Sequence, residues 1–346
     1  MSWAALIFKD TVITWPAVFA ALGAVCAMLG CLALYMARGH NPRELAAVLP
    51  AAVLLALVLG RLVHWYCHPL QYSGFLSAMT DFFQGGFSLS GVFAGVLLTA
   101  LLAAGAGVVT QLPDLLDALA PAGALGIAVG RMGSLFDLSD RGRFIIQNEA
   151  FRRLPFGAFT TFAEGAGEWR FATFAVQGLA AALLALALTW VHLALTRRML
   201  RQGEEAQGRV FALFLALYGA GQIVLDSTRY DPDFFRFNGF VHMPQILCGA
   251  ALAGAIVWLS VRSVRQNRLR WYHWICWVLT IFGMGLGGYM EYYVQRRAGE
   301  YILGYGVMSA ALALPALAAV ILCATLRPPS GKKQQPARSE GEGPSA

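Results

Sequence analysis

Residues 51–61 read AAVLLALVLGR, ten uncharged residues that end at an arginine. Uncharged runs of this kind recur along the whole chain of 346 residues, of which 58% are apolar or aromatic and only 13% are charged. A soluble domain carries roughly 25% charged residues and does not contain such long apolar runs. The pattern therefore predicts an all-α polytopic membrane protein.

Nine segments are long enough to cross a membrane, since a helix needs about 20 residues to span a hydrocarbon core of about 30 Å. We place them at 14–36, 46–67, 87–108, 113–133, 171–195, 209–228, 241–261, 271–293 and 303–326. Asp117 and Pro121 interrupt the fourth segment, and the eighth is rich in glycine and aromatic residues. The polar, Pro/Gly/Ser-rich tail at 327–346 is predicted to be disordered.

Basic residues in the loops indicate the orientation, because Lys and Arg are enriched in cytoplasmic loops. The loops 37–45, 196–209 and 262–270 carry two, four and four basic residues, and the tail carries four. The segment 134–170 carries five, but long segments cross the membrane regardless of their charge. We therefore expect the N-terminus outside, the tail in the cytoplasm, and 134–170 as an extracytoplasmic loop region.

Polar side chains within the spans are the main functional signal, because they are costly in a bilayer and tend to serve a function. Those that stand out are Arg61, Arg131, Tyr218, Gln222, Asp226, Arg229 and Gln245. In the expected topology all of them lie toward the outer ends of their spans. Arg61 is the deepest arginine, and we expect it to need a partner such as Asp226 or a phosphate.

Several arginines from different spans suggest a pocket for a phosphate. A guanidinium group offers a planar fork of donors that matches phosphate oxygens, and it stays charged in a partly dry site. Glycines near Arg131, including Gly142, would let the backbone approach a ligand closely. The alternative interpretation is that Arg131 and its neighbours only snorkel toward lipid head groups.

Metal, disulfide and nucleic-acid interpretations have little support. The six cysteines form no C-x-x-C pair, and small thiols in membrane helices usually serve packing. His64 and His68 are spaced for a shared metal, but no carboxylate or further His–Cys cluster lies nearby, which favours an ordinary helix end. The net charge of +7 fits arginine clusters that face anionic lipid heads rather than nucleic acid.

Five motifs now stand in order along the chain. They are the pair Gly60-Arg61, GGFSLSGVFAG (85–95), GRMGSLFDLSDRGR (130–143), LYGAGQIVLDSTR (217–229) and PQIL (244–247). Together they resemble the motifs of the prolipoprotein diacylglyceryl transferase family, over residues of about 14 to 262. The resemblance implies a seven-span transferase-like domain at 1–262, followed by two additional transmembrane helices within 263–326 that have no counterpart in the family.

The resemblance also implies a reaction. Enzymes of this family move a diacylglyceryl group from phosphatidylglycerol to the cysteine thiol of a lipobox in the bacterial cytoplasmic (inner) membrane, without a metal or cofactor. It implies catalytic roles for Arg131, Asp226 and Tyr218, with Arg131 holding the lipid head group. The residues implied to bind substrate are Arg131, Arg61, Gly142, Arg143, Arg229, Ser90, Asp137 and Gln245. The partners would be a phospholipid similar to phosphatidylglycerol and a lipoprotein precursor.

Several motif positions depart from the family pattern. Ser90 stands where the family has histidine, and Gln222 and Asp226 replace arginine and glutamate. Ser134, Asp137 and Ser139 replace two asparagines and an acidic residue, and FATFAVQ (171–177) replaces a further motif. Two alternatives therefore stay open. One is a non-catalytic relative that binds phospholipid or a membrane partner, and the other is a small-molecule transporter with Arg61 and Asp226 along its path.

Overall fold

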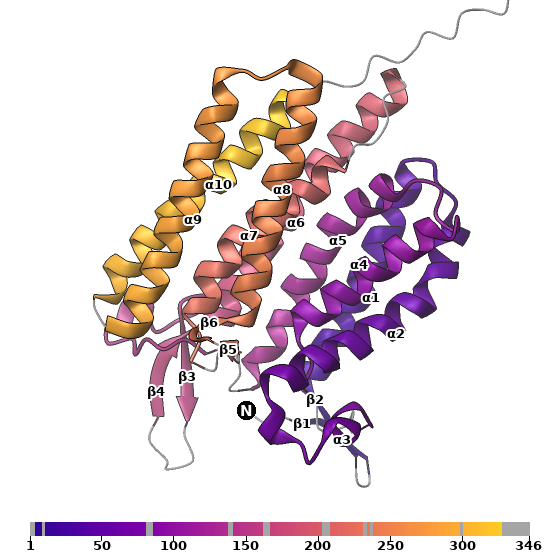
Figure 1. The fold of residues 1–346 in the computed structure, drawn as a ribbon. Helices are drawn as coiled ribbons and strands as arrows, with labels where there is room; N and C mark the ends of the chain where they lie inside the picture. The colour runs from indigo at the N-terminus through magenta and orange to yellow at the C-terminus, as the bar shows by residue number, and fades with distance from the viewer. Residues whose placement is uncertain are drawn as a thin grey trace, which may run out of the picture.

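The computed structural model describes residues 4–8, 11–80, 86–137, 141–161, 167–202, 208–230, 234–235, 238–297 and 300–326. Its long helices alternate in direction and form an antiparallel bundle (Figure 1). The helices are α1 (Trp15–Ala37), α2 (Pro42–Cys67), α3 (Phe75–Thr80), α4 (Leu89–Gly105), α5 (Leu112–Arg131), α6 (Thr173–Gln202), α7 (Arg209–Ser227), α8 (Met243–Asn267), α9 (Trp271–Arg297) and α10 (Tyr301–Thr325). Gly85, Ser139 and the predicted tail 327–346 lie outside the described residues.

Short elements gather at one end of the bundle, which we call the hairpin end (Figure 1). Three two-stranded antiparallel hairpins lie there, formed by β1 (Ala4–Phe8) with β2 (Thr11–Thr14), β3 (Gly157–Thr161) with β4 (Gly167–Phe171), and β5 (Phe234–Phe235) with β6 (Asn238–His242). The helix α3 lies at the same end, and a 3₁₀ turn, η3 (Met132–Leu135), continues α5. The predicted loop region 134–170 thus contains the β3 strand and part of β4.

Every predicted span coincides with a helix, and the all-α membrane fold is confirmed. Among the described residues, seven helices are long and apolar enough to cross a membrane, namely α1, α2, α5 with η3, α6, α7, α8 and α10. The third predicted span is shorter than expected, because α4 has 17 residues. The eighth, α9, has 27 residues, but its tryptophan-, tyrosine- and glycine-rich sequence is less apolar. Pro121 does not end its helix, since α5 continues through it.

Small residues allow the helices to approach closely. Lipid tails are as apolar as leucine, so membrane helices associate through tight packing of small side chains rather than through a hydrophobic driving force. A Cβ atom added to Gly95 would collide with the backbone of Leu55 on α2, so this glycine serves helix packing. Gly23 and Gly126 serve α1 and α5 in the same way, because each would meet the other's backbone oxygen.

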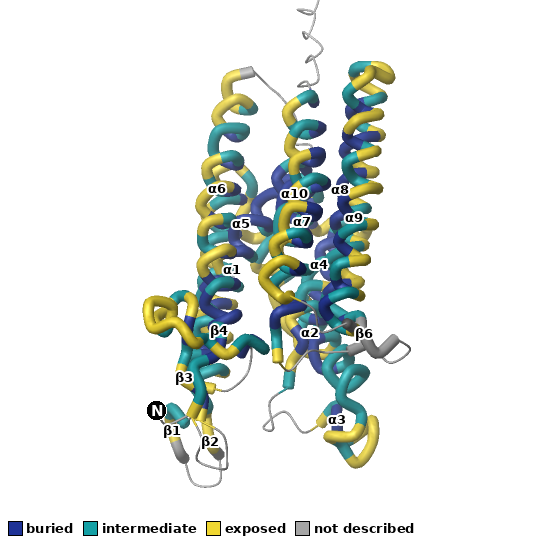
Figure 2. Tube along the Cα trace, turned by 90° about the vertical axis from the view of Figure 1, so that its left-hand side faces the viewer, coloured by how far each residue is buried: buried dark blue, intermediate teal, exposed yellow. Residues whose placement is uncertain are grey.

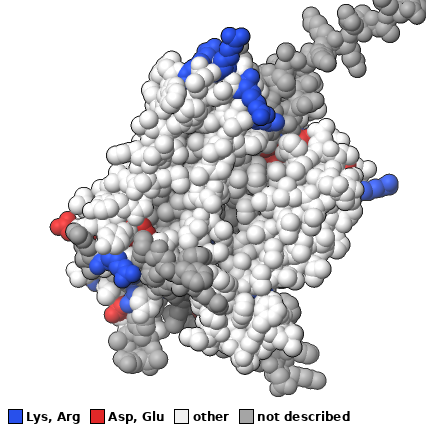
Figure 3. All heavy atoms as spheres, in the orientation of Figure 1, with Lys and Arg blue, Asp and Glu red and all other residues white. Residues whose placement is uncertain are grey.

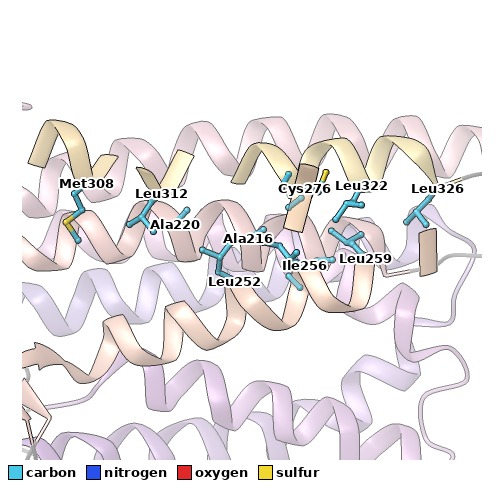
Figure 4. Packing of buried hydrophobic residues seen from close by; sticks show 14 residues of the cluster. Ala216, Ala220, Leu252, Ile256, Leu259, Cys276, Met308, Leu312, Leu322 and Leu326 are labelled. Carbon is cyan, nitrogen blue, oxygen red and sulfur yellow. The ribbon is translucent and has the colours of Figure 1, made fainter. Parts of the chain in front are cut away.

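The largest apolar core joins α7, α8, α9 and α10. Met308 and Leu312 of α10 lie against Ala216 and Ala220 of α7 and Leu252 of α8 (Figure 4). The outward faces of the helices are exposed along their length (Figure 2). Trp190 on α6, for example, is 73% exposed, as expected for a surface that faces lipid. The last two helices therefore share a core with the earlier ones.

A buried ionic group, which we call the Arg38 cluster, lies at the end opposite the hairpins. The guanidinium group of Arg38 is bonded to Asp114 at 2.6 Å and to Asp117 at 3.2 Å, and it donates to Thr196 at 3.3 Å. His40 contacts the second oxygen of Asp114. The free oxygen of Asp117 accepts the backbone N–H groups of residues 210 and 211 in the first turn of α7, at 2.9 and 3.0 Å. These contacts explain why a charged residue lies inside a span. Asp117 of α5 joins this helix to Arg38 at the end of α1 and to the first turn of α7.

Candidate functional site

The C-terminal end of α7 has backbone carbonyls that other elements must satisfy, because the last carbonyls of a helix have no partner within it. Gln245 of α8 donates to the oxygen of Ile223 at 3.2 Å, and Tyr305 of α10 donates to that of Ser227 at 2.8 Å. Just beyond the helix, the backbone N–H of Arg143 donates to residue 228 at 2.9 Å. Three separate segments therefore converge on this helix end.

Asp226 lies in the last turn of α7 and is fully buried. Its two oxygens contact Arg229 Nη1 at 3.4 Å and His242 Nδ1 at 2.8 Å. A buried carboxylate is costly unless it is paired, and the negative end of the helix dipole adds to that cost. The guanidinium group of Arg229 and the N–H group of His242 supply the compensation. His242 is in turn held by its backbone N–H, which donates to Gln245 Oε1 at 3.0 Å.

Arg143 is fixed at one edge of its guanidinium group. Its Nε donates to the backbone oxygen of Arg229 at 3.0 Å. Within the part of the chain that the structure describes, its two terminal amino groups bond to no other protein group. The side chain is only half-buried, so these amino groups can reach a ligand. Because Asp226 is matched by Arg229, the charge of Arg143 is in excess.

Gly142 lies where no side chain fits. A Cβ atom added to it would lie 2.7 Å from the Cβ atom of Phe171 in β4, and its backbone N–H donates to the Phe171 oxygen at 2.7 Å. It also forms an isolated antiparallel bridge with Arg229. The glycine therefore permits a close approach between two chain segments, and this approach sets the position of Arg143. We call Gly142, Arg143, Asp226, Arg229, His242 and Gln245 the α7-end cluster.

Arg131 lies apart from these contacts, at the junction of α5 and α6. It is the last residue of α5 and is half-buried, and its Cβ atom lies 3.5 Å from the position of a Cβ atom added to Gly178 of α6. The neighbouring Gln177 is 3% exposed, and among the described residues its amide nitrogen and oxygen have no hydrogen-bond partner. Sequence analysis did not single out Gln177, although a buried amide at this junction is a candidate ligand group.

Arg61 and Ser90 belong to a further group, between α2, α3 and α4. Arg61 is fully buried and donates to the backbone oxygens of Ala78 and Gly86, the latter at 3.0 Å. The hydroxyl of Ser90 lies 2.7 Å from that of Ser88. The expected pairing of Arg61 with Asp226 is wrong, because the nearby backbone supplies acceptors for Arg61, and Asp226 has Arg229 and His242.

The remaining predicted residues lie close to these groups. Tyr218 is on the same helix face as Asp226, eight residues earlier, and its ring stacks on Phe214 at 5.3 Å. Asp137 is exposed, and its backbone oxygen accepts from Arg141 Nη2 at 3.0 Å. Arg141 is itself buried with its guanidinium group 4.7 Å from the Phe174 ring, so it holds the loop together rather than snorkelling to lipid heads.

The predicted site residues thus lie toward the hairpin end of the bundle, and all except Tyr218 and Asp137 fall into three groups (Figure 1). One is the α7-end cluster, one is Arg131 at the α5–α6 junction, and one is Arg61 with Ser90. The signal that the sequence offered for the first group was the spacing of Tyr218, Gln222 and Asp226 on one helix face. His242 was missed as the partner of Asp226, because nothing in its local sequence marks it.

The pair His64 and His68 was considered for a metal. Their rings stack at 4.6 Å between centroids. Among the described residues, there is no group of three or more His, Cys, Asp or Glu side chains that could hold a metal ion. The stacked pair lies at the C-terminal end of α2, with His68 as its C-cap residue.

Comparison with known proteins identifies a family over most of the chain. The family model described as "Prolipoprotein diacylglyceryl transferase" matches residues 4–261. A phosphatidylglycerol–prolipoprotein diacylglyceryl transferase of Leifsonia xyli subsp. xyli is 29% identical over 256 residues, which cover 67% of this chain and 69% of the relative. Proteins of the same name from Polaromonas naphthalenivorans and Verminephrobacter eiseniae are 28% and 30% identical, over 65% and 58% of this chain and 79% and 69% of those relatives.

Proposed function

Because the chain belongs to the prolipoprotein diacylglyceryl transferase family, we propose that it moves a diacylglyceryl group from phosphatidylglycerol to the cysteine thiol of a lipoprotein precursor. Relatives that carry this name align with most of their own length. The α7-end cluster supports the proposal, since it brings two arginines of the family motifs to one helix end. The single observation that carries it is the geometry of Arg143.

The chemistry requires a positive group at the leaving phosphate. The thiol gives up its proton, a sulfur–carbon bond forms at the glycerol carbon, and the carbon–oxygen bond to phosphate breaks with its electron pair left on the phosphate oxygen. The glycerol phosphate that leaves takes up the proton. A fixed cation near this oxygen stabilises the charge that develops. Arg143 is anchored through Nε, its amino groups are available, and its charge is not matched by Asp226, which is bonded to Arg229. Arg131, at the α5–α6 junction, is proposed to hold the head group from a second side.

The proposal is tested by a lipobox peptide and phosphatidylglycerol vesicles mixed with the purified full-length protein. We expect the peptide to gain the mass of one diacylglyceryl group, and Arg143→Ala to reduce the rate by roughly a hundredfold, as does loss of one preorganised donor to a developing oxyanion. Arg153→Ala is a matched control, because Arg153 lies in the same loop region and its side chain is exposed. A folded wild-type protein that leaves the peptide unmodified would contradict the proposal.

A second candidate function, binding of phospholipid without catalysis, is favoured by one observation. Ser90 takes the place of the family histidine, and its hydroxyl is bonded to that of Ser88, so no imidazole is present at that position. In this case the arginines would still retain anionic lipid. This alternative makes two predictions. Phosphatidylglycerol should co-purify with the wild type, and its amount should fall in Arg131→Ala and Arg143→Ala. None of the three proteins should modify the peptide.

The orientation is part of the same proposal. We place the hairpin end outside the bacterial cytoplasmic membrane, with the N-terminus there and the C-terminus in the cytoplasm. On the face shown in Figure 3, Lys and Arg lie toward the two ends and the wide middle is uncharged, as expected for a lipid-facing band. The basic C-terminal part of α6 and the basic residues between α8 and α9 lie at the end opposite the hairpins. The orientation is tested by introducing a cysteine at Gly39 or at Tyr230 and adding a membrane-impermeant thiol reagent. In intact cells only the cysteine at position 230 should react.

A further inference from the structure

The helices α9 and α10 follow the last residue that the family model matches, at 261 in α8. They are nevertheless packed into the same body as the matched part. Leu312 and Leu322 of α10 belong to the core that α7 and α8 form (Figure 4). Contacts between α10 and α7 bring the start of α10 to the end of α7, where the α7-end cluster lies.

Tyr305, in the second turn of α10, caps α7. Its hydroxyl donates to the backbone oxygen of Ser227 at 2.8 Å, and the hydroxyl of Ser227 lies 3.4 Å from it. Ser227 is fully buried and directly follows Asp226. Because the Ser227 carbonyl lies at the helix end and has no intrahelical partner, the tyrosine replaces the water that would otherwise satisfy it. The hydrogen bond thus fixes the turn that carries both Asp226 and Arg229.

The same helix also holds the segment that carries Arg143. The ring of Phe144, the next residue, lies 5.2 Å from the ring of Tyr305 and 5.2 Å from that of Tyr301, in edge-to-face arrangements. Edge-to-face pairs of aromatic rings stabilise a contact beyond the effect of their buried area. Tyr305 therefore contacts both chain segments whose arginines define the α7-end cluster.

The polar surroundings of Tyr305 continue onto α9. Glu291 is 5% exposed, and its Oε1 accepts from Gln295 at 2.9 Å. Its second oxygen accepts no hydrogen bond from the described residues. The stretch of α9 that contains Glu291 packs against the start of α10, since a Cβ atom added to Gly304 would lie 2.7 Å from the side chain of Val294. A buried carboxylate at this position is not what a helix pair that only anchors the chain in lipid requires.

We propose that α9 and α10 form one wall of the active site and that Tyr305 is a positioning residue for Arg143 and Arg229. The inference rests on the proposed function, and it adds to it a part of the chain that the family model does not cover. Tyr305 touches no reacting atom in this scheme. Its hydroxyl and ring fix the α7 end relative to the 141–144 segment, so that Arg143 faces the phosphate beside the Asp226–Arg229 pair.

The test compares Tyr305→Phe with Tyr301→Phe in the full-length protein. The first removes the hydroxyl bonded to Ser227 and keeps the ring. The second removes a hydroxyl that bonds to no described residue and keeps the same kind of contact with Phe144. We expect Tyr305→Phe to lower kcat roughly tenfold with little change in KM, which corresponds to one lost hydrogen bond to a buried carbonyl. Tyr301→Phe should stay within about twofold of the wild type.

Amide hydrogen exchange separates positioning from general packing. Tyr305→Phe should speed exchange of the Arg143 and Tyr230 amides, which bond across this junction, and leave those of the Arg38 cluster unchanged. Phe144→Leu is a second variant, which keeps the cap but removes both ring contacts, and it should lower kcat several-fold with faster exchange at Arg143. Wild-type kcat and exchange in both variants would overturn the inference.

Failure of the Tyr305 inference can be distinguished from failure of the proposed transferase function. If the wild type modifies no peptide, the transferase proposal fails, and the Tyr305 inference is then judged by exchange and by retention of phosphatidylglycerol. Faster exchange with reduced lipid in Tyr305→Phe would keep the positioning role. Unchanged exchange and unchanged lipid would remove it.

Discussion

The two ends of α7 each hold a buried carboxylate, Asp117 against its first turn and Asp226 in its last, and the two are matched in different ways. In the Arg38 cluster the charges are enclosed. Arg38 bonds to both aspartates and to Thr196, and Asp117 accepts two N–H groups at the positive end of the helix dipole. In the α7-end cluster, Asp226 lies at the negative end of the dipole and Arg143 keeps its amino groups available.

The difference indicates which cluster stabilises the fold and which binds a ligand. A buried ion pair whose donors and acceptors are all satisfied within the protein has no capacity left for a substrate. A cluster with an excess guanidinium group that is anchored on one edge has such a capacity. Both clusters lie on the same helix, so a displacement of the first turn of α7 is expected to move the second cluster as well.

The largest effect is expected from Asp117→Ala. This change removes one of the two counter-charges of Arg38 together with the cap on α7, and loss of one partner of a buried ion pair costs about 3–5 kcal/mol. Thermal unfolding in detergent, followed by intrinsic fluorescence, measures the stability loss. Asp137→Ala serves as the control, since Asp137 is exposed, and its change should stay within about 0.5 kcal/mol. Equal stability of the two variants would contradict the proposal that the Arg38 cluster stabilises the fold.

Arg61→Lys should have an intermediate effect on stability. A lysine can donate to Ala78 or Gly86 but lacks the planar fork that reaches both, and a buried carbonyl left without a partner costs about 1–3 kcal/mol. The same thermal measurement, run beside the peptide assay, decides whether Arg61 serves the stability of the fold or the reaction. A stability loss with kcat preserved assigns it to the fold, whereas a loss of kcat at unchanged stability would place it in the site.

Asp226→Asn is expected to cost the least stability, about 1 kcal/mol, because the change also removes a negative charge from the unfavourable end of the helix dipole. Activity should fall further than stability, since Arg229 loses its ion pair and is free to turn away. Asp117→Asn is the matched variant at the other helix end, where the helix dipole favours the charge. If Asp226→Asn were the more destabilising of the two, the comparison of the two ends would be reversed.

Much of the fold was predictable from the sequence because hydrophobic length is a local property. Each of the nine long apolar segments had to become a helix, since a helix satisfies its own backbone hydrogen bonds in lipid. The face that carries Tyr218, Gln222 and Asp226 was also predictable, because helical spacing determines which residues share a side. The motifs that resemble the transferase family gave the remaining site candidates.

The pairing of charges was not predictable in this way. Asp117 looked like a defect in the fourth span, yet its partner Arg38 lies 79 positions away on another helix. Arg61 was expected to seek Asp226 or a phosphate, whereas the short helix α3 and the entry to α4 offer it backbone oxygens. Helix spacing gives no information about which distant helix lies opposite a given face.

The sequence by itself therefore determined that this chain is a helical membrane protein of the transferase family, because chain length, apolar runs and motif order are written residue by residue. Only the tertiary structure decided which arginine is enclosed and which is available, and that α10 caps the helix end carrying Asp226. The physical reason is that a buried charge is satisfied by whichever groups the packing brings within hydrogen-bond distance, and packing depends on the whole bundle.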